Sequence, residues 1–97
     1  RQVKADEALA IGLVDKVVPA GTHLQAALEW SGSFARGAVL AMGLSKRAVE
    51  GGLDTTLAGG LDLEAELFAE VISSEDATIG VQSFFEHGPG KAKFVGR

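Results

Sequence analysis

The chain has 97 residues, a net charge of −4 and no cysteine, and 46% of its residues are apolar. A chain of this length can bury one modest core, and its apolar content disfavours disorder. The negative charge disfavours nucleic acid as the main partner. The lack of cysteine excludes disulfides. No apolar run approaches the roughly 20 residues that span a bilayer, and the N-terminus has no signal-peptide pattern, which predicts a cytoplasmic protein without a membrane partner.

Two short elements are expected at the N-terminal end. Lys4 to Gly12 can form two helical turns, with acidic residues in the first turn and a glycine at the end. Leu13 to Val18 is rich in β-branched residues and is the one strand candidate. Because a lone strand leaves backbone groups unpaired, we expect its partner to lie outside this chain. The chain also begins with Arg1 instead of Met, which we interpret as a piece of a longer protein.

Two helices are predicted in the middle of the chain. A capping box of the form T-x-x-Q spans residues 22–25 and places the start of a helix at His23. Apolar residues then recur at spacings of three and four up to Ala35. A third helix is expected from about Ala38 to Glu50, where a stripe of small residues permits close helix contact. The glycine pair Gly51-Gly52 is expected to end it.

The longest helical pattern covers Leu57 to Ser74, and Asp54 can cap it. Its apolar side chains fall within roughly 160° of arc, so one face is expected to be core and the other to face water. The apolar face consists of Leu61, Ala65, Leu67, Phe68, Val71 and Ile72. Glu64 lies inside this arc, so its carboxylate is expected either to find a partner, such as Lys46 or Arg47, or to reach water at an edge of the face.

A last helix is predicted after Ser74, which precedes two acidic residues and can cap the helix. Its expected buried side consists of Ala77, Val81, Phe84 and Phe85. Gly88-Pro89 stops this helix, and a basic tail with Lys91 and Lys93 follows. Together these elements predict a mainly all-α fold, a small bundle of about four to five helices with one extended segment at Leu13 to Val18.

Few residues carry a chemical signature. His23 and His87 stand at unrelated spacing without cysteine, so no metal site is predicted, and His87 suits the C-terminal end of a helix. Ser45-Lys46 resembles a nucleophile with its base, but adjacent helix residues point about 100° apart. Glu64 is the best acid–base candidate, although a single buried carboxylate more often forms an ion pair. Two interpretations of Trp30 stay open: an exposed anchor for a partner, or a residue at the boundary of the core. No catalytic residue is predicted.

Residues 5–18, which read ADEALAIGLVDKVV, resemble the A-x-E-A-x-x-x-G-L-V-[DN]-x-V-V segment of the enoyl-CoA hydratase/isomerase (crotonase) superfamily. Further segments follow in the family's order: Leu63-Glu64, Leu67-Phe68, Ser74-Glu75-Asp76, Phe84-Phe85-Glu86 and Phe94-Val95-Gly96-Arg97. Any one segment is a weak signal, but the ordered series is fairly specific and covers essentially the whole chain.

The resemblance implies a two-part subunit, in which an N-terminal spiral of ββα units holds the active site and a C-terminal helical region forms a trimer or hexamer. This chain resembles only the second part, as a single helical trimerisation domain over residues 1–97. The catalytic carboxylates and oxyanion-hole segments would then precede Arg1, and Leu13 to Val18 would pair with the spiral domain. The implied partners are further copies and that missing N-terminal domain, and the chain alone would be inactive.

The implied chemistry of the parent is hydration of a 2-enoyl-CoA, or isomerisation through a thioester enolate, with the coenzyme A thioester as substrate and no cofactor. The resemblance also implies that Phe68 and a lysine after F-x-E contact the adenine end of CoA. His87 stands at that lysine's position, so Lys91 or Lys93 is expected to replace it. Core packing is the competing interpretation of Phe68. The competing function is an independent helical interaction module that binds a partner through the face of Leu61, Phe68 and Ile72.

Overall fold

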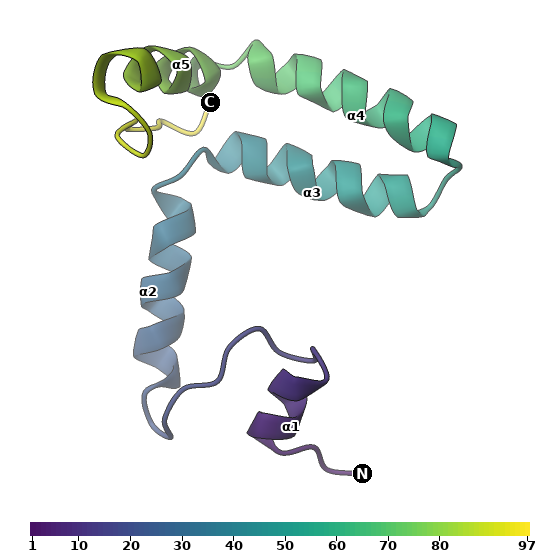
Figure 1. Ribbon diagram of the computed structural model, residues 1–97, viewed down its shortest axis with the longest axis vertical. Coiled ribbons are helices and arrows are strands. Elements are labelled where there is room, and N and C mark those ends of the chain that lie inside the picture. The colour runs from purple at the N-terminus through teal and green to yellow at the C-terminus, as the bar shows by residue number, and fades with distance from the viewer. The chain divides into compact units, whose positions relative to one another are not determined.

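The computed structural model describes residues 1–97 and contains five α-helices and no β-strand. In chain order they are α1 (Ala5–Ala10), α2 (His23–Ala35), α3 (Val39–Leu53), α4 (Leu57–Ile72) and α5 (Glu75–His87) (Figure 1). The predicted mainly all-α fold is therefore confirmed. The chain divides into two compact units, Arg1–Gly32 and Ser33–Arg97. None of the helices is long and apolar enough to cross a membrane.

In the first unit, α1 ends in a tight turn that does not lead into a strand. Gly12 adopts a positive φ of 71°, a conformation that glycine enters without steric cost. The backbone amides of Leu13 and Val14 then donate to the carbonyl of Ala8 at 2.8 and 3.4 Å. Residues 13–18 continue without regular secondary structure, so the strand candidate forms no strand within this chain. No other segment forms a strand with which it could pair, and the expectation that its partner lies outside the chain stays a prediction.

The helix α2 begins at His23 as predicted, but the predicted capping box does not form. The hydroxyl of Thr22 donates to the carbonyl of Pro19 at 2.8 Å. The side-chain amide of Gln25 donates to the carboxylate of Glu29 at 2.7 Å, one turn further along the helix. Both polar side chains are thus engaged in other local hydrogen bonds. The apolar stripe of α2 buries no residue.

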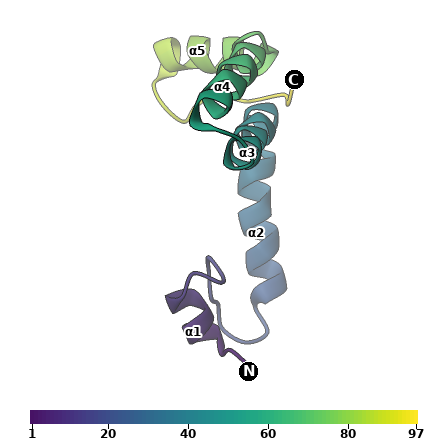
Figure 2. The same ribbon diagram turned by 90° about the vertical axis from the view of Figure 1, so that its right-hand side faces the viewer.

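In the second unit, α3 and α4 run antiparallel and lie side by side (Figures 1 and 2). Gly51 and Gly52 lie inside α3, so the prediction that they end the helix is wrong. Gly52 instead meets Gly60 of α4, where an added Cβ would lie 3.4 Å from the Cα of Gly52. The two helix backbones therefore approach closely at this point, where a methyl group would just fit and a larger side chain would not have room.

The start of α4 is Leu57 as predicted, but its cap is Thr56 and not Asp54. The hydroxyl oxygen of Thr56 accepts a hydrogen bond from the backbone N–H of Gly59 at 3.2 Å. Asp54 instead follows the last residue of α3 and serves as its C-cap residue. An N-cap residue directly precedes the first residue of its helix. Asp54 lies three residues before the start of α4 and therefore cannot be its N-cap.

The apolar core is much smaller than the predicted helix faces. Its buried apolar residues are Ala8, Leu44 and Leu67. Most of the predicted core face of α4 is open to solvent, including Leu61 and Ile72. The same holds for Val81, Phe84 and Phe85 of α5, so these burial predictions are wrong for the chain alone. The helices have the amphipathic pattern of a core, but a single helical hairpin covers only a narrow stripe of α4.

The last helix, α5, has both predicted end signals. The hydroxyl of Ser74 accepts from the backbone N–H of Ala77 at 3.0 Å, which confirms its predicted role as N-cap. Gly88 ends the helix with a φ of 79°. The tail then turns back along α5 towards its first turn (Figure 1). The tail ends beside Asp76, the one buried charged residue of the chain.

Candidate functional site

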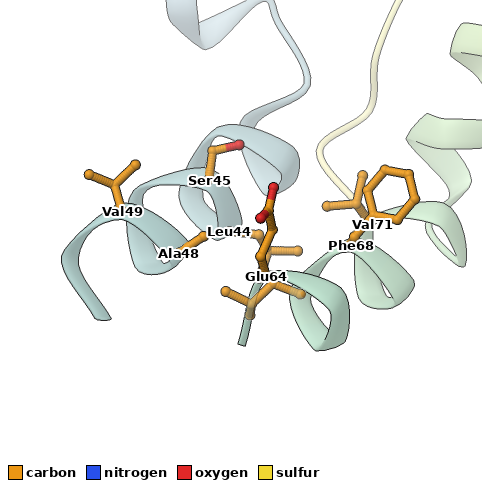
Figure 3. Close-up of a pocket in the computed structure, with 8 residues that line it drawn as sticks. Leu44, Ser45, Ala48, Val49, Glu64, Phe68 and Val71 are labelled. Atoms are coloured by element: carbon orange, nitrogen blue, oxygen red, sulfur yellow. The ribbon is translucent and has the colours of Figure 1, made fainter. Parts of the chain in front are cut away.

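A shallow groove of about 250 Å³ lies between α3 and α4 and includes Phe68. Its lining residues are Leu44, Ser45, Ala48, Val49, Glu64, Leu67, Phe68 and Val71 (Figure 3). Only Ser45 and Glu64 bring polar groups to this surface, and Leu44 and Leu67 are its buried members. The groove therefore offers an apolar surface to an aromatic ring or to a side chain of another protein segment.

Glu64 is exposed, so of the two expected arrangements its carboxylate reaches water and does not pair with Lys46 or Arg47. Lys46 pairs with Glu50 one turn further along α3, with 3.4 Å between Nζ and Oε1. Arg47 reaches across to Glu70 of α4 at 3.9 Å. Both cations are thus used elsewhere, and the carboxylate of Glu64 is solvated. A single solvated carboxylate is a poor candidate for general acid–base chemistry, because it lacks a second group to complete proton transfer.

A second groove, of about 370 Å³, lies at the C-terminal end of α5. Its lining residues are Ile79, Gln82, Ser83, Glu86, His87, Lys91 and Lys93. We call this surface the basic groove. It brings together His87, predicted to lie at the CoA edge, and both lysines, Lys91 and Lys93, that were expected as replacements for the family's lysine.

The cations of the basic groove are largely uncommitted. Lys91 and Lys93 form none of the five ion pairs in the chain. His87 has one carboxylate neighbour, Glu86, with 3.5 Å between Nε2 and Oε2. Two free ammonium groups on one concave surface attract anions, and the three N–H donors of each suit phosphate oxygens.

Phe68 does not belong to the basic groove. It lies on α4 in the groove with α3, whereas His87 and Lys91 lie at the end of α5 and in the tail. Phe68 is 62% exposed, so core packing, the competing interpretation, does not describe it in the chain alone. That all three residues contact one CoA molecule stays a prediction.

Other candidates have simple structural surroundings. His23 is exposed at the first position of α2. Trp30 is 44% exposed, and the Nζ of Lys16 lies 6.0 Å from its ring centre, within the range of a cation–π contact. No three His, Asp or Glu side chains gather in a way that could hold a metal ion. The Nζ of Lys46 is directed to Glu50, so this lysine does not act as a base for the adjacent Ser45.

Asp76 is the residue whose importance the sequence interpretation missed. Its position in the first turn of α5 indicated only a favourable interaction with the helix dipole. In the structure its carboxylate binds backbone N–H groups 19 and 20 residues further along the chain. No rule of sequence spacing connects positions so far apart. In the sequence, Asp76 stood out only as the last residue of the Ser74-Glu75-Asp76 segment.

Comparison with known proteins shows the family to which the chain belongs. The family model described as "Enoyl-CoA hydratase/isomerase" matches residues 1–96. The short-chain-enoyl-CoA hydratase of Clostridium acetobutylicum is 37% identical over 86 residues, which are 89% of this chain and 33% of the relative. The crotonyl-CoA hydratase of Syntrophomonas wolfei is 33% identical over 95 residues, which are 98% of this chain and 36% of the relative.

A solved structure is similar over nearly the whole chain. The crystal structure of an enoyl-CoA hydratase from Geobacillus kaustophilus HTA426 matches with a TM-score of 0.90 and 29% identity. The match covers 98% of this chain and 35% of that one. The chain thus spans about a third of the length of these relatives.

Proposed function

Because this chain belongs to the enoyl-CoA hydratase/isomerase family, we propose that it is the oligomerisation and CoA-edge region of an enzyme of that family. The proposed parent reaction is addition of water to a 2-enoyl-CoA, or related chemistry through a thioester enolate. In this proposal the reacting carboxylates and the oxyanion donors come from outside residues 1–97. The chain contributes assembly and a phosphate-binding edge, and alone it catalyses no hydration.

The exposed apolar face of α4 is the observation that carries the proposal. Leu61, Phe68 and Ile72 lie on one side of the helix and are 55%, 62% and 59% exposed. Full burial of one such side chain stabilises a protein by about 1.5–3 kcal/mol. A monomer gains nothing from an apolar stripe that stays in water, whereas a subunit uses it against another protein surface. The stripe therefore supports a role in assembly with further copies and with a catalytic domain.

The basic groove supports the second half of the proposal. Coenzyme A carries phosphate groups at its adenine end, and these are anions of the kind that free lysines attract. Lys91 and Lys93 are exposed and lie on the same groove as His87. An acidic chain with a net charge of −4 thus concentrates positive charge at one place. The apolar ring of Phe68 is the surface on which an adenine base could stack.

Calorimetric titration with CoA tests this edge. We expect the double variant K91Q/K93Q to bind CoA at least tenfold more weakly than the unmodified chain, because hydrogen bonds to charged groups contribute about 1.5–3 kcal/mol each. The matched control is K46Q, which removes a lysine charge that is paired with Glu50 and lies outside the groove. Equal affinity of the double variant and the control would contradict the proposal and favour the interaction module.

An absorbance assay with a short 2-enoyl-CoA tests the expected lack of catalysis. We expect no turnover above the buffer rate, because Glu64 is a single solvated carboxylate without a partner for proton transfer. Turnover that survives repurification and is lost in E64Q would overturn the proposal that the reacting groups lie outside this chain.

A further inference from the structure

Asp76, in the first turn of α5, forms three hydrogen bonds with the C-terminal tail. Its carboxylate accepts hydrogen bonds from the backbone N–H of Val95 at 2.7 Å and of Gly96 at 2.9 Å. Its own backbone N–H donates to the carbonyl of Arg97 at 2.9 Å. Three successive tail residues therefore bind one aspartate.

The burial of Asp76 shows that this contact is built into the fold. Asp76 is 3% exposed, and a buried carboxylate is strongly unfavourable unless its charge is compensated. None of the ion pairs in the chain includes it. The compensation comes from the two hydrogen bonds to its carboxylate oxygens and from the positive end of the α5 dipole, since Asp76 is the second residue of that helix. The guanidinium of Arg97 adds a smaller electrostatic interaction with Asp76. Without the tail, both backbone hydrogen bonds to the carboxylate are lost.

Close packing holds the tail on either side of this aspartate. The ring of Phe94 lies against Gly80 of α5, where an added Cβ would come within 3.4 Å of the ring. Gly96 has a φ of 82° and lies against Val39 of α3, where an added Cβ would be 3.1 Å from a methyl group. The guanidinium of Arg97 binds the carboxylate of Glu75 at 2.7 Å. This hydrogen bond raises the pKa of Arg97 above its ordinary value.

The tail leaves α5 at the opposite end of the helix, where the backbone N–H of Gly88 donates to the carbonyl of Phe84 at 3.0 Å and closes the last turn. Lys91 and Lys93 lie between this point and the residues bound by Asp76, and both line the basic groove. We infer that Asp76 is a positioning residue, whose carboxylate holds the tail on α5 and thereby keeps the two lysines beside His87. The consequence for CoA rests on the proposed function, whereas the attachment of the tail does not.

The variant D76N tests the attachment directly. It conserves the size of the side chain, but the neutral amide has only one acceptor oxygen and turns an N–H₂ donor towards one of the tail amides. We expect amide hydrogen exchange at Val95 and Gly96, followed by NMR, to become at least tenfold faster while the amides within α3 keep their protection. The matched control is E75Q, which removes the exposed partner of Arg97 and is expected to leave Val95 and Gly96 protected.

Unchanged exchange at Val95 and Gly96 in D76N would overturn the inference, and so would an equal increase in E75Q. If D76N lost its helical circular dichroism, V95P would serve as the second variant. It removes one of the two N–H donors and leaves Asp76 in place, so exchange at Gly96 is expected to rise.

CoA affinity separates the positioning role from simple stabilisation. We expect D76N to weaken CoA binding about as much as K91Q/K93Q does, and E75Q to bind CoA like the unmodified chain. Released tail amides with unchanged CoA affinity would overturn the positioning role of Asp76. If the unmodified chain bound no CoA, the proposed CoA edge would fail, while hydrogen exchange would still decide whether Asp76 holds the tail.

Discussion

Leu67 and Phe68 are neighbours in α4, yet truncation to alanine should affect them very differently. Leu67 is 5% exposed and is one of the three buried apolar residues of the chain. The change L67A should therefore cost about 2–5 kcal/mol of unfolding free energy, as large-to-small changes in a core do. Phe68 is 62% exposed, so it keeps less than half of the contacts of a buried ring. We expect F68A to cost about 1 kcal/mol in a dilute sample.

Urea unfolding followed by circular dichroism, at a low and a high protein concentration, measures both effects. If another subunit covers the face that contains Phe68, the loss of unfolding free energy in F68A should grow with protein concentration. The reason is that the ring is buried, and its removal therefore costs stability, only in the assembled form. The cost of L67A should persist in the dilute sample. A loss from F68A in the dilute sample as large as that from L67A would refute the reasoning, since the ring would then be core within a single chain.

Two further changes test the construction of the α3–α4 pair. T56A should lower the unfolding free energy by about 1 kcal/mol, because it removes the hydroxyl that caps α4. The control D54A should lower it clearly less, and equal urea midpoints of the two variants would contradict the assignment of the cap. G60V should destabilise by about 1–3 kcal/mol, because the added methyl groups would collide with the backbone of Gly52; a rise in the thermal midpoint would show that the helices separate without cost.

Local signals in the sequence predicted most of the helix positions. Ser74 before two acidic residues and Gly88 before a proline mark the ends of α5, because a cap and a stop act within one turn. The same rules failed at Gly51-Gly52. A glycine pair is typical of the end of a helix, but this pair lies inside α3 at its contact with α4. The sequence alone does not show this contact, because Gly60 comes next to Gly52 only when α4 folds against α3.

Burial was predicted less well, because a helical period shows which residues share a face and not what covers that face. Phe68 follows the period of a core residue but is exposed in this chain. The sequence left Glu64 between a cation partner and a solvated edge, and only the structure shows that it is solvated while Arg47 reaches Glu70. The tail contact of Asp76 depends on how α5 and the tail fold together, which no local pattern contains.

The mass of the particle in solution tests the central claim most directly. Sedimentation equilibrium of the chain, from micromolar to near-millimolar concentration, should show assemblies larger than the 10.0 kDa of one copy, because the exposed stripe of Leu61, Phe68 and Ile72 is expected to seek a protein surface. The variant F68E should shift this equilibrium towards the monomer. A compact 10.0 kDa monomer over the whole concentration range would contradict a role in assembly.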